Sequence, residues 1–205
     1  MSTAVLAPPP TTSPPSVGAP RPVRWTCDEF HQMGEAGQFE GRRAMLIEGI
    51  ILEQGPMNPP HAVTVNLVSD TLRAIFGVGW VVRAQLPLEL DLSTDPQPDA
   101  CVVTGKALDY YTSHPTTAHL VVEISDSTLA FDRGEKASLY AAGGIADYWV
   151  VDLIHRQLLV FRDPQPDASE THGHVYRQRL TFGPTEAVAP LAAPGSPIAV
   201  ADLLP

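Results

Sequence analysis

A short, almost unbroken apolar segment, His119–Ile124, places the strongest constraint on the fold of this chain. It reads His-Leu-Val-Val-Glu-Ile, and its bulky aliphatic residues favour a β-strand. A strand that is apolar on both sides is buried on both faces, so it lies near the middle of a sheet that other elements cover. The segment therefore predicts a central strand, with its one acidic residue, Glu123, close to the strand end.

The remaining apolar patterns predict the elements around this strand. Helices are expected from apolar spacing, capping patterns and terminal glycines at Thr26 to about Met33, at His61–Phe76 and at Asp132 to about Ala142. In the third helix, Asp132 is the predicted N-cap and Glu135 its reciprocal partner. Further strands are expected at Met45–Glu48, Ile50–Glu53, Trp80–Gln85, Leu86–Leu90, Asp99–Thr104, Asp147–Asp152, Gln157–Arg162 and, weakly, Tyr176–Phe182. Together they predict an α/β domain, a mixed and curved β-sheet of about six to eight strands flanked by helices.

Length and composition predict one domain. The chain of 205 residues is 44% hydrophobic, which supports one sizeable core over residues 25–205. Residues 1–24 hold seven of the 21 prolines and no acidic residue, which is typical of a disordered or polyproline arm. We expect neither a membrane span nor a signal peptide. Cys27 and Cys101 lack zinc-type spacing and are typical of reduced thiols in a cytoplasmic protein.

The charge balance restricts the binding partners. The formal net charge is −10, with 11 arginines and only two lysines, Lys106 and Lys136. Because phosphate contacts carry most nonspecific nucleic-acid affinity, this charge disfavours a nonspecific nucleic-acid binder. It still permits a nuclease, since carboxylates that bind a cation add negative charge where the cation offsets it. The candidate phosphate contacts are Arg42, Arg43, Arg73 and Arg133.

Two carboxylates stand at the ends of predicted strands. Asp99 follows Gln97-Pro98 and begins one strand, whereas Glu123 lies at the end of another. If these strands are neighbours, both carboxylates lie at one end of the sheet, and the carbonyl of Ile124 follows as a third oxygen ligand. Mg²⁺ takes oxygen ligands of this kind, and a water bound to Mg²⁺ or Mn²⁺ becomes more acidic.

Helix geometry directs an amine toward the same point. Side chains on a helix lean toward its N-terminus, so the amine of Lys136 is expected to project back toward Glu123. Tyr140 lies four residues further on the same helix face. Two carboxylates and an amine that steadies the attacking water or the phosphate charge predict a divalent-metal phosphodiesterase.

The motifs resemble the Uma-two family of putative restriction endonucleases, in the PD-(D/E)XK nuclease superfamily. The resemblance covers about Trp25 to Arg162 and implies a restriction-endonuclease-like fold, an Mg²⁺ or Mn²⁺ cofactor and cleavage of DNA. The matching motifs, in order, are Leu46-Ile-Glu-Gly-Ile50, His61, Gln97-Pro-Asp99, Leu120-Val-Val-Glu-Ile-Ser125, Asp132-Arg-Gly-Glu-Lys136 with Tyr140, and Asp147-Tyr-Trp-Val-Val-Asp152.

The resemblance also implies residue functions. Asp99 and Glu123 match the family's metal carboxylates, and Lys136 matches its migrated lysine. Ser125 stands two residues after the glutamate, at the superfamily's usual lysine position, and is counted with the catalytic set. Activity therefore requires that Lys136 reach the site from its helix.

Weaker expectations concern two more residues and the assembly. Glu48 is similar to an acidic family position that approaches the metal, and His61 is expected to line the cleft. A homodimer is expected because cutting both DNA strands requires two sites.

Two other functions remain open from the residues alone. The acidic balance also fits a catalytically silent module on the same fold that binds nucleic acid or a protein. An oligomeric scaffold with Trp149 at its interface is a third hypothesis, but it leaves the acidic residues unexplained. Tyr148 and Trp149 are expected in the core or at a dimer interface, and His172-Gly-His174 is expected to be a surface segment.

Overall fold

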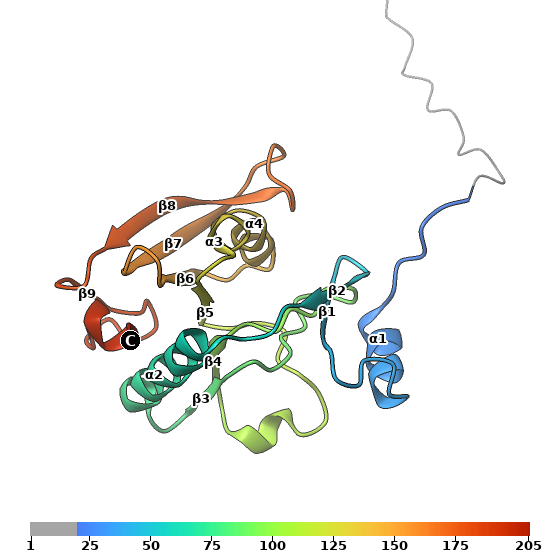
Figure 1. The fold of residues 1–205 in the computed structure, drawn as a ribbon, viewed down its shortest axis with the longest axis horizontal. Coiled ribbons are helices and arrows are strands. Elements are labelled where there is room, and N and C mark those ends of the chain that lie inside the picture. Colours follow the sequence, from blue (N-terminus) through green and yellow to red (C-terminus); the bar gives the residue numbers. More distant parts are fainter. Residues whose placement is uncertain (1–19) are drawn as a thin grey trace, which may run out of the picture.

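A six-stranded mixed sheet forms the centre of the computed structural model, which describes residues 20–205 (Figure 1). The predicted arm at residues 1–24 lies mostly outside the described residues. The sheet has the order β3-β4-β5-β6-β7-β8, with β5 and β6 parallel and the other neighbouring strands antiparallel. The bounds are Trp80–Arg83 for β3, Ala100–Thr104 for β4, Leu120–Ser125 for β5, Asp147–Asp152 for β6, Gln157–Pro166 for β7 and His174–Phe182 for β8.

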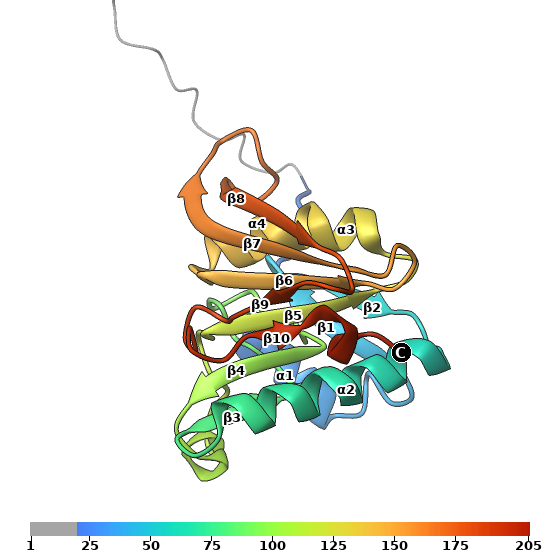
Figure 2. The same cartoon turned by 90° about the vertical axis from the view of Figure 1, so that its left-hand side faces the viewer.

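Helices cover both faces of this sheet (Figure 2). The helix α2 (Pro59–Phe76) and the 3-10 helix η2 (Val200–Leu203) pack on one face, and α4 (Glu135–Ala142) packs on the other. The short helix α3 (Leu129–Arg133) precedes α4, and the 3-10 helix η1 (Ala107–Tyr110) follows β4. This arrangement confirms the predicted α/β class.

The central strand β5 shows why both faces are covered. All six of its residues are buried, as the apolar run predicted. Val122 and Ile124 pack in the core beneath α2, whereas Val121 packs in the core beneath α4. Tyr148 and Trp149 of β6 are fully buried, one in each core, which confirms that they are core aromatics.

The N-terminal part adds a hairpin and a helix beside the sheet. The strands β1 (Arg43–Ile47) and β2 (Ile50–Gln54) pair in antiparallel fashion, as predicted. The helix α1 (Cys27–Glu35) begins with the predicted capping box between Thr26 and Glu29. Two short strands near the C-terminus, β9 (Ala187–Val188) and β10 (Ile198–Ala199), form a second small pair.

The predicted strand at Leu86–Leu90 is wrong. Its backbone hydrogen bonds go to loop carbonyls, because Leu88 donates to Pro96, Glu89 to Pro115 and Leu90 to Thr94. Leucines at every second position, of which only Leu88 is buried, imitate the pattern of a strand in a segment that has no neighbouring strand. The strands β7 and β8 extend further than predicted and pair as far as Pro166 and His174.

Two sequence-based expectations concern composition. Cys27 and Cys101 are buried and unpaired, in agreement with reduced thiols. Within residues 20–205, none of the helices combines the length and apolar character needed to cross a bilayer.

Gly49 holds the β1–β2 turn against the segment that precedes α1, and this contact yields a stability prediction. Its φ is +75°, and an added Cβ would lie 2.8 Å from Arg24 Cβ and 3.0 Å from the Trp25 nitrogen. We expect Gly49→Ala to lower the free energy of unfolding by roughly 1–3 kcal/mol in urea denaturation. Gly55→Ala is the matched control, because its added Cβ meets open space. Equal effects of the two substitutions would contradict this explanation.

Candidate active site

The register of β4 and β5 places two carboxylates opposite each other. Ala100 pairs with Val122 in this antiparallel ladder, so the next position sets Asp99 against Glu123. Both side chains lie on the sheet face that α4 covers, because Cys101 and Val121 pack there. The backbone nitrogen of Asp99 is 3.4 Å from Glu123 Oε2. The predicted convergence of the two acids is therefore present.

Hydrogen bonds fix the carboxylate of Asp99. Its Oδ1 lies 3.0 Å from His61 Nε2 and accepts from Gln85 Nε2 at 3.1 Å, and its Oδ2 accepts from the Ile124 backbone at 2.9 Å. Burial acts to raise the pKa of Asp99, but these donors outweigh it and hold the pKa below its ordinary value. Burial acts to lower the pKa of His61, but the hydrogen bond and the charge of Asp99 outweigh burial, so the pKa of His61 is raised. Asp99 is thus kept ionised.

Glu123 is held from the opposite side by α4. Its Oε1 lies 3.0 Å from Lys136 Nζ and accepts from the Tyr140 hydroxyl at 2.6 Å. Burial raises the pKa of Glu123 to about 7, and the charges of Asp99 and Asp132 raise it too, against the opposing effect of Lys136. The carboxylate therefore loses its proton only near neutral pH in the metal-free protein.

Lys136 reaches this point from a helix that differs from the predicted one. The single helix from Asp132 to Ala142 is wrong, because Gly134 separates α3 from α4. A Cβ at Gly134 would lie 2.8 Å from the carbonyl oxygen of Ala130, which explains why glycine stands at the break. Asp132 belongs to α3 and is not an N-cap, and Gly134 occupies the cap position of α4.

Asp132 serves as a second partner of the amine. Its Oδ1 lies 3.6 Å from Lys136 Nζ, and its Oδ2 accepts from the Thr128 hydroxyl at 2.5 Å. Burial acts to lower the pKa of Lys136, but the charges of Glu123 and Asp132 outweigh it and raise the pKa. The amine stays protonated and pairs with two carboxylates, while Asp99 lies beside Glu123 as a third carboxylate of the cluster.

An open cleft of about 440 Å³ is lined in part by four side chains of this cluster, Asp99, Glu123, Asp132 and Lys136. Lys136 keeps 11% of its side-chain surface exposed there, whereas Glu123 keeps 3%. Residues of the hairpin β1–β2 and of the start of α2 line the cleft as well. Other lining residues are Arg43, Glu53, His61, Gln97, Asp126 and Phe131.

The donor set suits a hard divalent cation. Asp99 and Glu123 supply carboxylate oxygens, and within residues 20–205 the only hydrogen bond to Glu123 Oε2 is the long one from the Asp99 backbone. The N–H of Ile124 points to Asp99, and in a strand the carbonyl of the same residue points to the same side. Mg²⁺ binds through such oxygens together with water, so the residues fit a cation of this class.

Other predicted site residues lie elsewhere. Ser125 Oγ is buried and has no hydrogen-bond partner among the described residues. Glu48 is absent from the cleft wall, and its carboxylate lies 2.7 Å from His172 Nδ1. The segment from His172 to His174 is partly exposed, in agreement with the predicted surface segment, although the His172 side chain itself is only 5% exposed. Arg73 pairs with Asp70 on α2, and Arg43 alone of the four candidate arginines lines the cleft.

Sequence analysis missed two residues of this network. Gln85 follows β3, and its contact with Asp99 gives no local sequence signal. The link between Asp132 and Lys136 was detectable, because residues four apart in a helical segment lie on one side. The sequence analysis did not predict this link because it assigned Asp132 as an N-cap.

The raised pKa of Glu123 predicts pH-dependent stability. In the unfolded chain the carboxyl titrates near 4.5, and in the folded protein near 7. Between these values the folded state holds the extra proton, so the free energy of unfolding falls as pH rises. We expect Glu123→Gln to flatten this fall in urea denaturation between pH 4.5 and 7.

Glu53→Gln provides the control, since this carboxylate is 58% exposed in the same cleft. It should leave the pH dependence unchanged. A Glu123→Gln protein that loses stability as steeply as the wild type would show that Glu123 does not hold the proton.

Comparisons with known proteins agree with this geometry. The sequence profile of Uma2, described as putative restriction endonuclease, matches residues 27–196. The fold is similar to that of a putative nuclease belonging to DUF820 from Anabaena variabilis, with a TM-score of 0.64 and 14% identity over 87% of this chain and 97% of that chain. No curated protein matches the chain. Because the profile spans most of the sequence, this chain belongs to the Uma2 family of putative restriction endonucleases.

Proposed function

We propose that this protein is a divalent-metal-dependent endonuclease that hydrolyses phosphodiester bonds of DNA. The convergence of Asp99, Glu123 and Lys136 carries the proposal, because side chains far apart in sequence meet in one open cleft. The description of the family as restriction endonucleases supports the same reaction.

Mg²⁺ or Mn²⁺ is the proposed cofactor. Asp99, Glu123 and the carbonyl of Ile124 would hold it. When bound, the cation would supply positive charge at the phosphate and make a bound water more acidic. The surplus of carboxylates over the single ammonium group favours uptake of a cation here.

The protein's own groups have distinct proposed tasks. Lys136 stabilises negative charge that develops on the scissile phosphate, since its ammonium group is held by two carboxylates and borders the cleft. Tyr140 and Lys136 hold Glu123 in one orientation. His61 keeps Asp99 ionised and in place.

The proposal includes a homodimer. Each chain contributes one Asp99–Glu123 acid pair, so cleavage of both strands of a duplex at one locus requires two copies. Arg43 borders the cleft and is the arginine best placed to contact a DNA backbone phosphate.

A plasmid-nicking assay tests the proposed chemistry. We expect Lys136→Ala to lower the nicking rate in Mg²⁺ or Mn²⁺ by about 10²–10³-fold, the usual cost of losing one group that stabilises transition-state charge. Lys106→Ala is the matched control, because it removes the other lysine, which lies exposed in the segment before η1. Its rate should equal that of the wild type.

Asp99→Ala should abolish nicking, and circular dichroism should show that each variant is folded. Nicking that persists equally in Lys136→Ala and Asp99→Ala would overturn these assignments.

The acidity of the cleft favours one alternative, a catalytically silent nucleic-acid- or protein-binding module. Glu53, Asp126 and Asp132 line the same cleft and oppose approach of a phosphate backbone while no cation is bound. Isothermal titration separates the two functions. Uptake of Mn²⁺ that Asp99→Ala abolishes supports the endonuclease, whereas no uptake at millimolar Mn²⁺ supports the silent module.

A further inference from the structure

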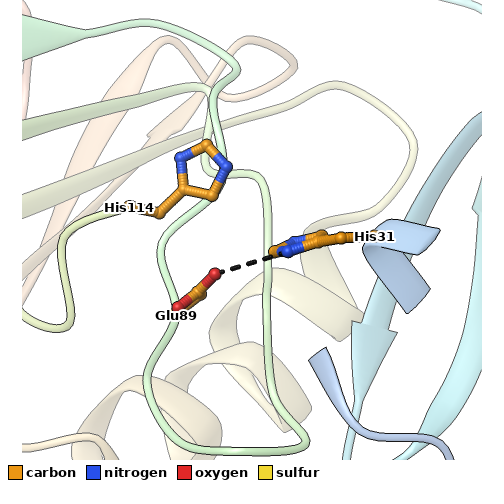
Figure 3. Close-up of side chains that lie close together, drawn as sticks. All are labelled: His31, Glu89 and His114. Carbon is orange, nitrogen blue, oxygen red and sulfur yellow. Dashed lines mark ion pairs between the residues drawn. The ribbon is translucent and has the colours of Figure 1, made fainter. Parts of the chain in front are cut away.

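A second group of metal-binding side chains lies outside the cleft. His31 of α1, Glu89 and His114 come from three separate segments, and their ligand atoms all lie within 4.8 Å of one another (Figure 3). A backbone hydrogen bond of 3.0 Å from Glu89 to the Pro115 carbonyl joins two of these segments. None of the three residues lines the cleft that holds Asp99 and Glu123.

A buried carboxylate orients the first histidine. His31 Nε2 lies 2.9 Å from Oδ2 of Asp95, whose side chain is fully buried. Since an ionised carboxylate only accepts, Nε2 carries the hydrogen, and Nδ1 of the neutral ring keeps its lone pair. A carboxylate on the far nitrogen of a ligating histidine is the usual second layer of a protein metal site.

The free nitrogen of His31 faces another acceptor. Its Nδ1 lies 3.6 Å from Glu89 Oε1. A lone pair and a carboxylate oxygen repel each other at this distance unless a proton or a cation lies between them. The surroundings leave this demand unmet, because Asp95 Oδ1 is buried and has no hydrogen-bond partner among the described residues, and burial raises the pKa of Asp95 against the opposing effect of His31.

His114 completes the ligand set. Its ring lies 5.5 Å from that of His31 between centroids, at 74° (Figure 3). Burial lowers the pKa of His114, and this favours the neutral form that can coordinate a metal. Arg83 opposes a cation, because its Nη2 lies 3.4 Å from His114 Nδ1 and donates to that lone pair. Metal binding through Nδ1 therefore requires Arg83 to give up this contact and keep its hydrogen bond of 3.2 Å to the Pro87 carbonyl.

We propose that His31, Glu89 and His114 bind a transition-metal cation of the zinc class, with Asp95 orienting His31. Two imidazoles and one carboxylate are a common zinc ligand set, and they differ from the all-oxygen set that suits Mg²⁺. The metal would join α1 to the loops on either side of β4. Asp95 exchanges backbone hydrogen bonds with Leu46 of β1 and precedes Asp99 by four residues, so the site would brace the approach to the catalytic cleft.

Co²⁺ and Zn²⁺ added to the metal-free full chain test this inference. We expect one Co²⁺ with visible absorption bands typical of four-coordinate nitrogen and oxygen ligands, displaced by Zn²⁺. Zn²⁺ at about 100-fold above its Kd should raise the melting temperature by roughly 5–10 °C. The same bands should appear in Asp99→Ala, which separates this site from the catalytic cleft.

Variants locate the ion. His31→Gln and His114→Gln should each lose the absorption bands and the thermal shift, and Glu89→Gln should weaken binding at least tenfold. His155→Gln is the control, because His155 is 59% exposed and pairs with Asp152 elsewhere. Circular dichroism of the metal-free variants verifies folding.

Two results would overturn the proposal. The first is an absence of Co²⁺ uptake by the wild type at pH 7.5, which would mean that a proton bridges His31 and Glu89. The second is uptake that is unchanged in both folded histidine variants. Either result leaves the endonuclease proposal intact, because no residue of that site is altered.

Discussion

The buried contact between Lys136 and Glu123 is the interaction on which the site depends. Three carboxylates of this cluster are almost fully buried around one ammonium group, and a buried charge is tolerated only when it is paired and hydrogen-bonded. Asp99 satisfies this condition with three partners, His61, Gln85 and the Ile124 backbone, whereas Glu123 Oε2 has only a long contact from the Asp99 backbone, and burial raises the pKa of Glu123. The cluster is thus short of positive charge. Under the proposed function, a site with this deficit would sacrifice stability and gain affinity for a cation at the same place.

The packing of the sheet sets the positions of the acids. A slip of one residue between β4 and β5 would send Asp99 or Glu123 to the opposite face. Such a slip would also move Val121 and Val122 into the wrong cores, so the apolar contacts that hold the sheet together fix the acid pair as well. The fold and the site are specified by the same ladder of residues.

Local patterns predicted much of this structure. The buried strand β5, the hairpin β1–β2, helix α2 and the meeting of Asp99, Glu123 and Lys136 all follow from apolar spacing and from the order of elements. The failures depend on contacts with residues distant in the chain. Leu86–Leu90 bonds to loop carbonyls such as that of Pro115, and the ring of His172 pairs with Glu48, 124 positions earlier in the chain. Gln85 donates a hydrogen bond to Asp99 from a turn, and no helical or strand periodicity in the sequence predicts this contact. The break at Gly134 depends on a close approach to Ala130.

That break explains how a helical lysine can replace one on the strand. Ser125 occupies the strand position two residues after Glu123, and its hydroxyl is buried without a partner in the described part of the chain, so no charge enters the cluster from there. Gly134 instead begins a new helix, α4, within reach of the end of β5, and the amine of Lys136 lies 3.0 Å from Glu123. Asp132, which belongs to α3, forms a second ion pair with the same amine. Electrostatic stabilisation depends on where the charge lies and not on which backbone carries it, so under the proposed function a lysine on α4 would meet the same requirement as one on β5.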